Sequence, residues 1–150
     1  MSDPSSLQVR PGITADADVV DAWLHTRQPL PVPAARARRV MLEALLGQGG
    51  QGLCVVAATV DGMRGCLPVS LAPNLSLHGQ ACCVTEWWGD PADAEALEAC
   101  LAMLGDWCRA HGVRHVLLAP GLSATPPRGF ALHPSGMWHL VATPAAKVLG

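Results

Sequence analysis

The sequence of 150 residues contains no tyrosine and one phenylalanine, and only 15% of its residues are charged. Without tyrosine, no phenol group is available as an acid. The formal net charge is -2 and no block of like charge occurs, which argues against nucleic acid or an anionic membrane as the main partner. No apolar run approaches the roughly 20 residues that span a bilayer. The first six residues lack the pattern of a signal peptide, so a cytoplasmic location is expected.

The six cysteines include no C-x-x-C pair. All lie in apolar segments that are typical of strands and helices, where a free thiol behaves as a small apolar side chain. Core packing is therefore favoured over disulfides or metal binding. Cys108, His111 and His115 are close in sequence, but Gly112 separates them and their spacing matches no recognised ligand pattern. No metal site is expected.

Half of the residues are apolar, and this length suits a single domain, residues 1–150, with a sizeable core. Hydrophobic periodicity and turn residues predict, in order, a strand over 7–10, a helix that Thr14 caps and a helix over 33–46. An antiparallel meander follows, with strands over 53–60 and 64–71 around an Asp61-Gly62 turn and a strand over 77–88. A last strand is predicted over 137–143.

The middle of the chain organises the rest. We expect a tight turn at Trp88-Gly89 and then a long amphipathic helix, with Asp90 as its N-cap and Pro91 at its first position. Gly112 ends the helix, and a strand over 113–119 follows at once. Strand, helix and strand at this length form a crossover unit, so the two strands should be parallel neighbours. The buried stripe of the helix is expected to consist of Leu97, Leu101, Leu104 and Cys108.

The segment Gly47 to Gly52 matches G-x-G-x-x-G letter for letter. That motif binds dinucleotides when it follows a strand and opens a helix, because the helix N-terminus then holds the pyrophosphate. Here a helix precedes the glycines and a strand follows them. The segment is therefore predicted to be a helix-to-strand loop.

Four short pieces of sequence carry a family resemblance: Val9-Arg10-Pro11 before Thr14-Ala15-Asp16, the Asp61-Gly62 hairpin, the run from Trp107 to Val113, and Gly129-Phe130. Their order resembles the GNAT acetyltransferase superfamily. The resemblance implies an α/β (α+β) fold with a mixed, mainly antiparallel sheet and a central crossover helix between two parallel strands. It also implies transfer of an acyl group from acetyl-CoA, or another acyl-CoA, to an amine on a small molecule or a peptide.

The sequence departs from the family where the pyrophosphate of acetyl-CoA should bind. The family pattern, Arg or Gln-x-x-Gly-x-Gly or Ala, should stand before the central helix, where this chain has Trp88 to Glu95 and no basic residue. Asp93 and Glu95 stand about where the glycines would be. A helix N-terminus favours negative charge by roughly 0.3–1 kcal/mol per group. The acids are therefore either good caps, or a sign that the phosphate cradle has been lost, or both.

The resemblance assigns the catalytic base to Glu86, near the end of the third strand, where a glutamate in family members can deprotonate an amine. An apolar setting beside the tryptophans would raise its pKa; the alternative is a solvated acid at a strand end. The family's frequent general acid is a tyrosine, which this chain lacks. Contacts to acyl-CoA are expected at five positions: Val84, Thr85, Trp87, Gly89 and Ala94.

Other features leave alternatives open. Trp87 and Trp88 suit a stacking wall for a ligand, a core position or a subunit contact, and are compatible with a homodimer. The basic face formed by Arg36, Arg38 and Arg39 suits an acidic acceptor, a CoA phosphate or plain solvation. Two functions follow: an N-acyltransferase, or a GNAT-like binding or dimerising module that no longer binds acetyl-CoA normally.

Overall fold

The computed structural model describes residues 6–143. Its elements are, in chain order, β1 (Gln8–Pro11), the 3-10 turn η1 (Thr14–Asp16), α1 (Ala17–Arg27), α2 (Val32–Leu46), β2 (Gly52–Thr59), β3 (Gly62–Asn74), β4 (Gly79–Val84), β5 (Trp88–Gly89), α3 (Ala94–His111), β6 (His115–Leu118), the 3-10 turn η2 (Pro120–Leu122), β7 (Ala131–Leu132) and β8 (Trp138–Val141). None of the described helices is long and apolar enough to span a membrane.

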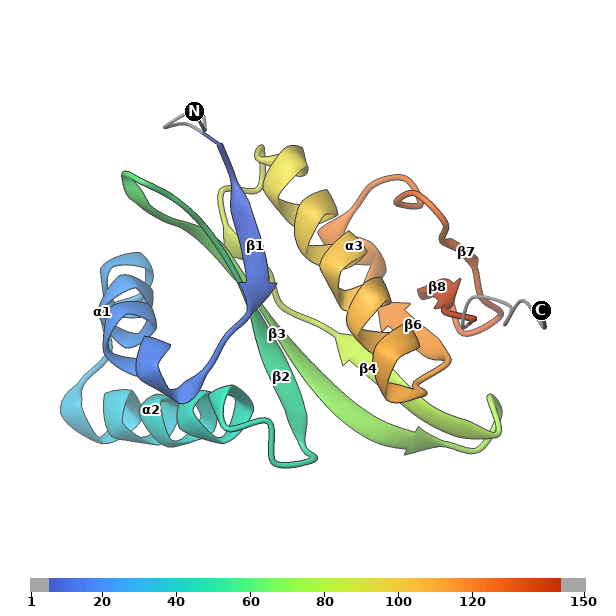
Figure 1. Ribbon diagram of the computed structural model, residues 1–150, viewed down its shortest axis with the longest axis horizontal. Helices are drawn as coiled ribbons and strands as arrows, with labels where there is room; N and C mark the ends of the chain where they lie inside the picture. Colours follow the sequence, from blue (N-terminus) through green and yellow to red (C-terminus); the bar gives the residue numbers. More distant parts are fainter. Residues whose placement is uncertain (1–5, 144–150) are drawn as a thin grey trace, which may run out of the picture.

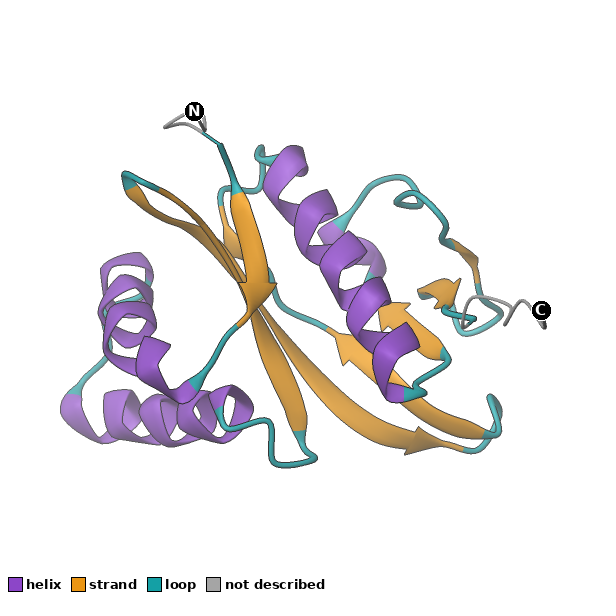
Figure 2. Ribbon diagram, in the orientation of Figure 1, coloured by secondary structure: helices purple, strands orange, loops and turns teal. Residues whose placement is uncertain are grey.

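One twisted sheet forms the centre of the molecule, with its strands in the order β1-β2-β3-β4-β6-β8-β7 and β5 beside β3 (Figure 2). The β4–β6 pair is parallel, and the other described pairs are antiparallel. The helix α3 connects the two parallel strands, as a crossover requires. The predicted mixed, mainly antiparallel sheet with a central crossover helix is therefore confirmed.

Helices cover the two faces of the sheet separately (Figure 1). The helix α3 packs on one face and encloses the larger core cluster, in which its predicted stripe is buried. The pair α1 and α2 packs on the other face, over β2 and β3, and encloses a smaller cluster. The six cysteines are free and five of them are buried, so their assignment to core packing is confirmed. Each helix thus buries one apolar stripe against the sheet.

The start of α3 differs from the prediction. The helix begins at Ala94, and its N-cap is Asp93, whose carboxylate accepts a hydrogen bond from the Ala96 N–H at 3.2 Å. Arg64, on β3, donates hydrogen bonds of 2.7 Å to both carboxylate oxygens of Asp93. This long-range ion pair selects Asp93 over Asp90 as the cap. Gly112 ends the helix in the left-handed region, at φ 72°, as predicted.

Several other boundaries move by a few residues. The first hairpin turns at Val60-Asp61 instead of Asp61-Gly62, because Thr59 and Gly62 are paired. Thr14 does not cap a helix; it begins η1, and the Ile13 N–H instead bonds the Asp16 carboxylate at 2.8 Å. The glycine-rich segment 47–52 joins the end of α2 to β2, as expected of a helix-to-strand loop.

Candidate active site

The parallel strands β4 and β6 part immediately ahead of α3. Their pairing runs from Ala81 opposite His115 to Val84 opposite Leu118, and one further bond joins the Ala119 N–H to the Val84 carbonyl at 2.9 Å. The chain after β6 then enters η2, whereas the chain after β4 continues along β3 as β5. The segments that follow the two strands therefore separate like a V from this point, whereas β6 is paired with β4 along its whole length.

The route of the chain after β4 corrects two predictions. Trp88 and Gly89 form no tight turn, because they pair with Cys66 and Gly65 on β3. The predicted single strand over 77–88 is broken, since residues 85–87 lie in neither β4 nor β5. The sheet therefore contains one strand interrupted by three residues, and the interruption lies at the mouth of the V.

Pro68 explains why the interruption occurs there. On β3 the Leu71 N–H bonds to the Gln51 carbonyl at 2.9 Å. From residue 66 to residue 74, the backbone N–H and C=O groups of odd-numbered residues therefore point to β2, and those of even-numbered residues point to β4 and β5. Residue 70 pairs with Cys83 and residue 66 with Trp88. Pro68, midway between them, has no N–H to donate. The missing ladder bond thus coincides with the three unpaired residues.

The interruption leaves main-chain groups free. Within residues 6–143, neither Thr85 nor Glu86 makes a backbone–backbone hydrogen bond. Both residues are exposed. Free N–H and C=O groups at a strand edge are able to pair with an extended ligand, as an added strand does.

The two tryptophans point to opposite faces of the sheet. Trp87 packs against the cluster under α3, and its ring covers Gly65 and Gly89, where an added Cβ would overlap it. Trp88 packs against the cluster under α1 and α2. Both are half-buried. Each tryptophan therefore packs against a core cluster on one side and lines the groove on the other.

Glu86 stands on the same face as Trp88. Its carboxylate accepts a hydrogen bond from the Trp88 indole N–H at 3.1 Å. The side chain is exposed, because β4 ends at Val84 and residue 86 lies beyond it. Glu86 lines an open groove of about 570 Å³, together with Arg27, Gln28, Trp87, Trp88, Gly89 and Leu122.

The front of α3 is occupied by the protein's own charges. The Arg64 guanidinium, hydrogen-bonded to Asp93, holds the pKa of that carboxyl below its ordinary value. Glu95 lies 3.8 Å from the same guanidinium, and the Ala92 N–H bonds to the Asp90 carboxylate at 2.9 Å. Carboxylates therefore take the favourable position that a pyrophosphate would need. Capping and loss of the phosphate cradle are both consistent with this arrangement.

A larger groove, of about 730 Å³, lies between α3 and residues 127–130. Three carboxylates and two guanidiniums line it: Glu95, Glu98, Asp106, Arg109 and Arg128. Arg109 is paired with Asp106 at 3.2 Å. This groove is larger than the one beside Glu86, but its lining holds neither the V nor the unpaired residues 85–87.

Cys108, His111 and His115, which are close in sequence, do not come together in the structure. Cys108 contacts Cys82, with their sulfur atoms 3.6 Å apart, and His111 stacks on Trp107. His115 instead faces His139 on β8, at 3.0 Å between Nδ1 and Nε2. Among the described residues, no group of three or more His, Cys, Asp or Glu side chains is placed to hold a metal ion.

The sequence matches no protein-family model and no curated protein. Solved structures do match. The GNAT-family N-acetyltransferase YhbS from Escherichia coli, in complex with CoA, superposes with a TM-score of 0.65 at 19% identity over 95% of this chain and 86% of that one. The chain has the fold of the GNAT acetyltransferases. A candidate GNAT acetyltransferase from Desulfovibrio desulfuricans gives 0.61 at 17%, over 92% and 100%. A predicted acetyltransferase with acetyl-CoA from Clostridium acetobutylicum gives 0.57 at 10%, over 76% and 80%.

Within this GNAT fold, the five expected acyl-CoA positions differ in what they offer. Val84 already gives its carbonyl to Ala119, Gly89 lies under the Trp87 ring, and Ala94 is the first residue of α3. Of the five, Thr85 offers backbone N–H and C=O groups that make no backbone–backbone hydrogen bond within residues 6–143. Pro68, within the predicted strand over 64–71, indicates a bulge or an unpaired edge position from sequence alone, but sequence reasoning did not connect it with a break in the neighbouring strand. It missed Arg64 as the partner of the acids.

Proposed function

We propose that this protein is an acyl-CoA-dependent N-acyltransferase that transfers an acyl group to an amine. One observation carries the proposal: the segments after β4 and β6 diverge ahead of a crossover helix, and the unpaired residues 85–86 stand at the point of divergence. An extended pantetheine arm fits such an edge, because its amides can pair with free main-chain groups. The fit fails for the pyrophosphate, since carboxylates occupy the front of α3.

Glu86 is proposed as the base. Its exposed carboxylate lines the groove that opens beside residues 85–87, where an incoming amine is able to reach it directly or through one water. Acyl-CoA supplies the thioester carbonyl that the amine attacks, with the CoA thiol as leaving group. The Trp88 indole, which donates to Glu86 at 3.1 Å, fixes the orientation of the carboxylate. The proton lost by the amine passes to Glu86.

Titration with acetyl-CoA tests the first half of the proposal. Trp87 and Trp88 flank the mouth, so ligand binding should change tryptophan fluorescence in a saturable way. Because carboxylates occupy the front of α3, we expect weak binding, with a Kd of about 0.1–1 mM, or roughly 4–5.5 kcal/mol of binding free energy. No saturable change up to millimolar acetyl-CoA would refute the proposal.

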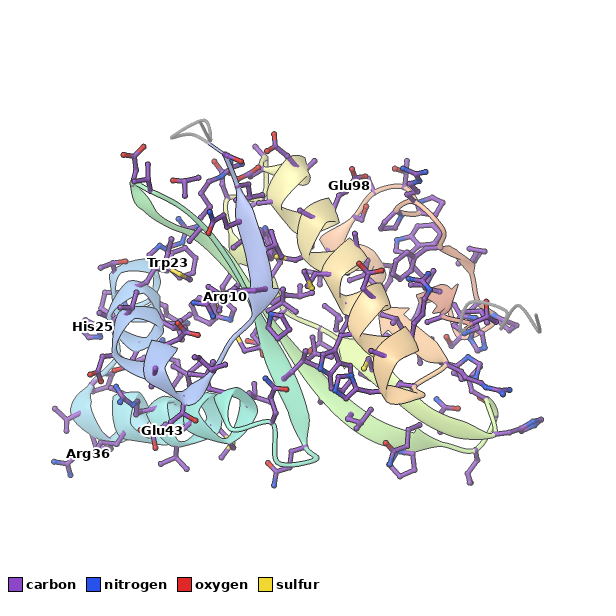
Figure 3. The ribbon with its side chains drawn as sticks, in the orientation of Figure 1. Arg10, Trp23, His25, Arg36, Glu43 and Glu98 are labelled. Carbon is purple, nitrogen blue, oxygen red and sulfur yellow. The ribbon has the colours of Figure 1, made fainter. Side chains whose placement is uncertain are left out.

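Turnover tests the second half. A positioned base contributes about 10²–10⁴-fold, so Glu86→Gln should reduce acetylation of an amine panel by that factor. Glu43→Gln is the matched control, because Glu43 lies on α2 and is ion-paired with Arg39 (Figure 3). Equal rates for wild type and Glu86→Gln would remove Glu86 from the mechanism.

The alternative is a binding or dimerising module with the GNAT fold. The observation that favours it is the acidic front of α3, where Asp93 and Glu95 share Arg64. Under this alternative, acetyl-CoA produces neither saturable binding nor turnover. Acetylation that Glu86→Gln abolishes and Glu43→Gln preserves would exclude it.

A further inference from the structure

An arginine is turned inward in a small cavity that shares Glu86 and Trp88 with the groove. Arg38, on α2, places its guanidinium carbon 5.6 Å from the centre of the Trp88 ring. Its Nη1 donates to the Gln28 carbonyl at 3.0 Å. Its Nε is buried and has no hydrogen-bond partner within residues 6–143. A buried donor without a partner is costly, so this guanidinium is a candidate for a ligand.

A second arginine stands at the other wall. Arg27, the last residue of α1, lines the same groove as Glu86 and lies 5.3 Å over the Trp23 ring. A smaller cavity of about 90 Å³ adjoins the groove and is lined by Arg38, Glu86 and Trp88, among others. Arg27, from α1, and Arg38, from α2, therefore line two neighbouring hollows that share Glu86 and Trp88 as a wall.

Neither arginine is neutralised by a protein carboxylate. In the described part of the chain, no ion pair involves Arg27 or Arg38, whereas Arg39, their neighbour, has three acidic partners: Asp18, Asp21 and Glu43. The Glu86 carboxylate is engaged by Trp88. A half-buried guanidinium with a free Nε suits a carboxylate or phosphate, which accepts parallel N–H bonds from it.

We propose that this groove binds the acyl acceptor, and that the acceptor carries an anionic group, a carboxylate or a phosphate, in addition to its amine. The amine lies at Glu86, and the anionic group lies at Arg38 and Arg27. The inference rests on the proposed function for the identity of the ligand as acceptor. Arg27 and Gln28, at the end of α1, form one wall of the groove, and Trp87, Trp88 and Leu122 form the rest.

Binding of matched probes tests this without acyl-CoA and without turnover. The chain has five tryptophans, and the Trp88 indole N–H signal in a ¹H–¹⁵N spectrum, assigned with Trp88→Phe, reports on the groove. The first pair of probes is N-acetylglycine and its neutral amide. The second is phosphoethanolamine and ethanolamine. The two pairs distinguish a carboxylate from a phosphate.

The variants are Arg38→Gln, Arg27→Gln and Arg38→Lys. Arg38→Lys keeps the positive charge but removes the parallel N–H donors of the guanidinium. Arg36→Gln is the matched control, because Arg36 is exposed and projects from α2 away from the sheet (Figure 3). We expect saturable shifts of the Trp88 signal with the anionic member of at least one pair. Arg38→Gln should weaken that binding about tenfold, in line with loss of a charge-assisted hydrogen bond, and Arg36→Gln should not change it.

Three results would overturn the proposal: no saturable shift with any probe, an equal response to the neutral members, or unchanged affinity in both Arg38→Gln and Arg27→Gln. Arg38→Lys separates charge from geometry and should bind with intermediate affinity. Failure of acetyl-CoA to bind would refute the transferase and leave these results standing, because no acyl-CoA is present in the measurement.

Discussion

At the residue scale, the Trp87 ring depends on two glycines. It covers Gly65 and Gly89, and neither glycine has room for a methyl group. Gly65→Ala should therefore displace the ring and destabilise the fold by about 1–3 kcal/mol, the usual cost of overpacking. Chemical denaturation measures this. Gly79→Ala, on β4 with open space around it, is the control and should be nearly neutral. Equal stability of the two variants would show that the ring moves freely.

Asp93 gives the protein a pH dependence of known sign. Hydrogen bonding to Arg64 lowers the Asp93 pKa from its ordinary value of 3.8. A lowered pKa in the folded state stabilises the protein above 3.8, and this stabilisation is lost as the pH falls through the folded-state pKa. Asp93→Asn keeps the cap but removes the charge, so its difference in free energy of unfolding from wild type should shrink below pH 3.8.

The control for this effect is Asp93→Ala, which also removes the cap and should cost about 1 kcal/mol more than Asp93→Asn at every pH. Urea denaturation at a series of pH values from 3 to 7 provides the comparison. A constant difference between wild type and Asp93→Asn over that range would mean that the ion pair does not set the pKa.

At the element scale, the order and type of the main elements could be predicted, because each follows from local periodicity. The buried stripe of α3 and its end at Gly112 are examples. The start of α3 could not be predicted, because several acids precede it and the choice of Asp93 depends on Arg64, on a distant strand. The break between β4 and β5 was missed for a similar reason: residues 77–88 read as one apolar strand, and the cause lies in Pro68 on β3.

The role of Pro68 leads to a prediction about the opening itself. Pro68→Val supplies an N–H that faces residues 85–87, so it should allow them to pair with β3 and narrow the mouth. We expect slower amide hydrogen exchange at residues 85–86 and weaker binding of acetyl-CoA. Pro73→Val, also on β3 but with its N–H directed to the β2 side, beyond the Gln51–Leu71 bond, is the matched control. Unchanged exchange in Pro68→Val would assign the break to another cause.

At the scale of the whole molecule, the charges of the candidate site are divided between the two faces of the sheet. Carboxylates stand beside Arg64 at the front of α3, whereas Arg27 and Arg38, which form no ion pair within residues 6–143, stand on the side of α1 and α2. Sequence reasoning could not find this division, because it depends on which face each side chain takes after the strand break. The homodimer stays a prediction, and sedimentation at several protein concentrations tests it.

The charge arrangement predicts an unusual response to salt. CoA carries phosphates, this chain has a net charge of -2, and carboxylates surround the front of α3, so the long-range interaction between them is repulsive. Salt screens exposed charges, with a Debye length that falls from about 10 Å at 0.1 M to about 3 Å at 1 M. The Kd of acetyl-CoA should therefore decrease as NaCl is raised from about 0.05 to 0.5 M. A basic cradle would give the opposite trend, because salt would weaken its attraction for phosphate.

Acetyl-pantetheine, which has the same thioester arm and no phosphate, is the matched ligand. Its Kd should be nearly independent of salt, so the ratio of the two Kd values isolates the phosphates from any general effect of salt on the protein. Glu95→Gln should reduce the salt dependence for acetyl-CoA, because it removes one of the repelling charges, whereas Asp106→Asn, three turns further along α3, should not. If acetyl-CoA instead binds more weakly as salt rises, cations hold its phosphates. Arg128, which lines the groove beside α3 and has no ion pair within residues 6–143, is then the first residue to substitute.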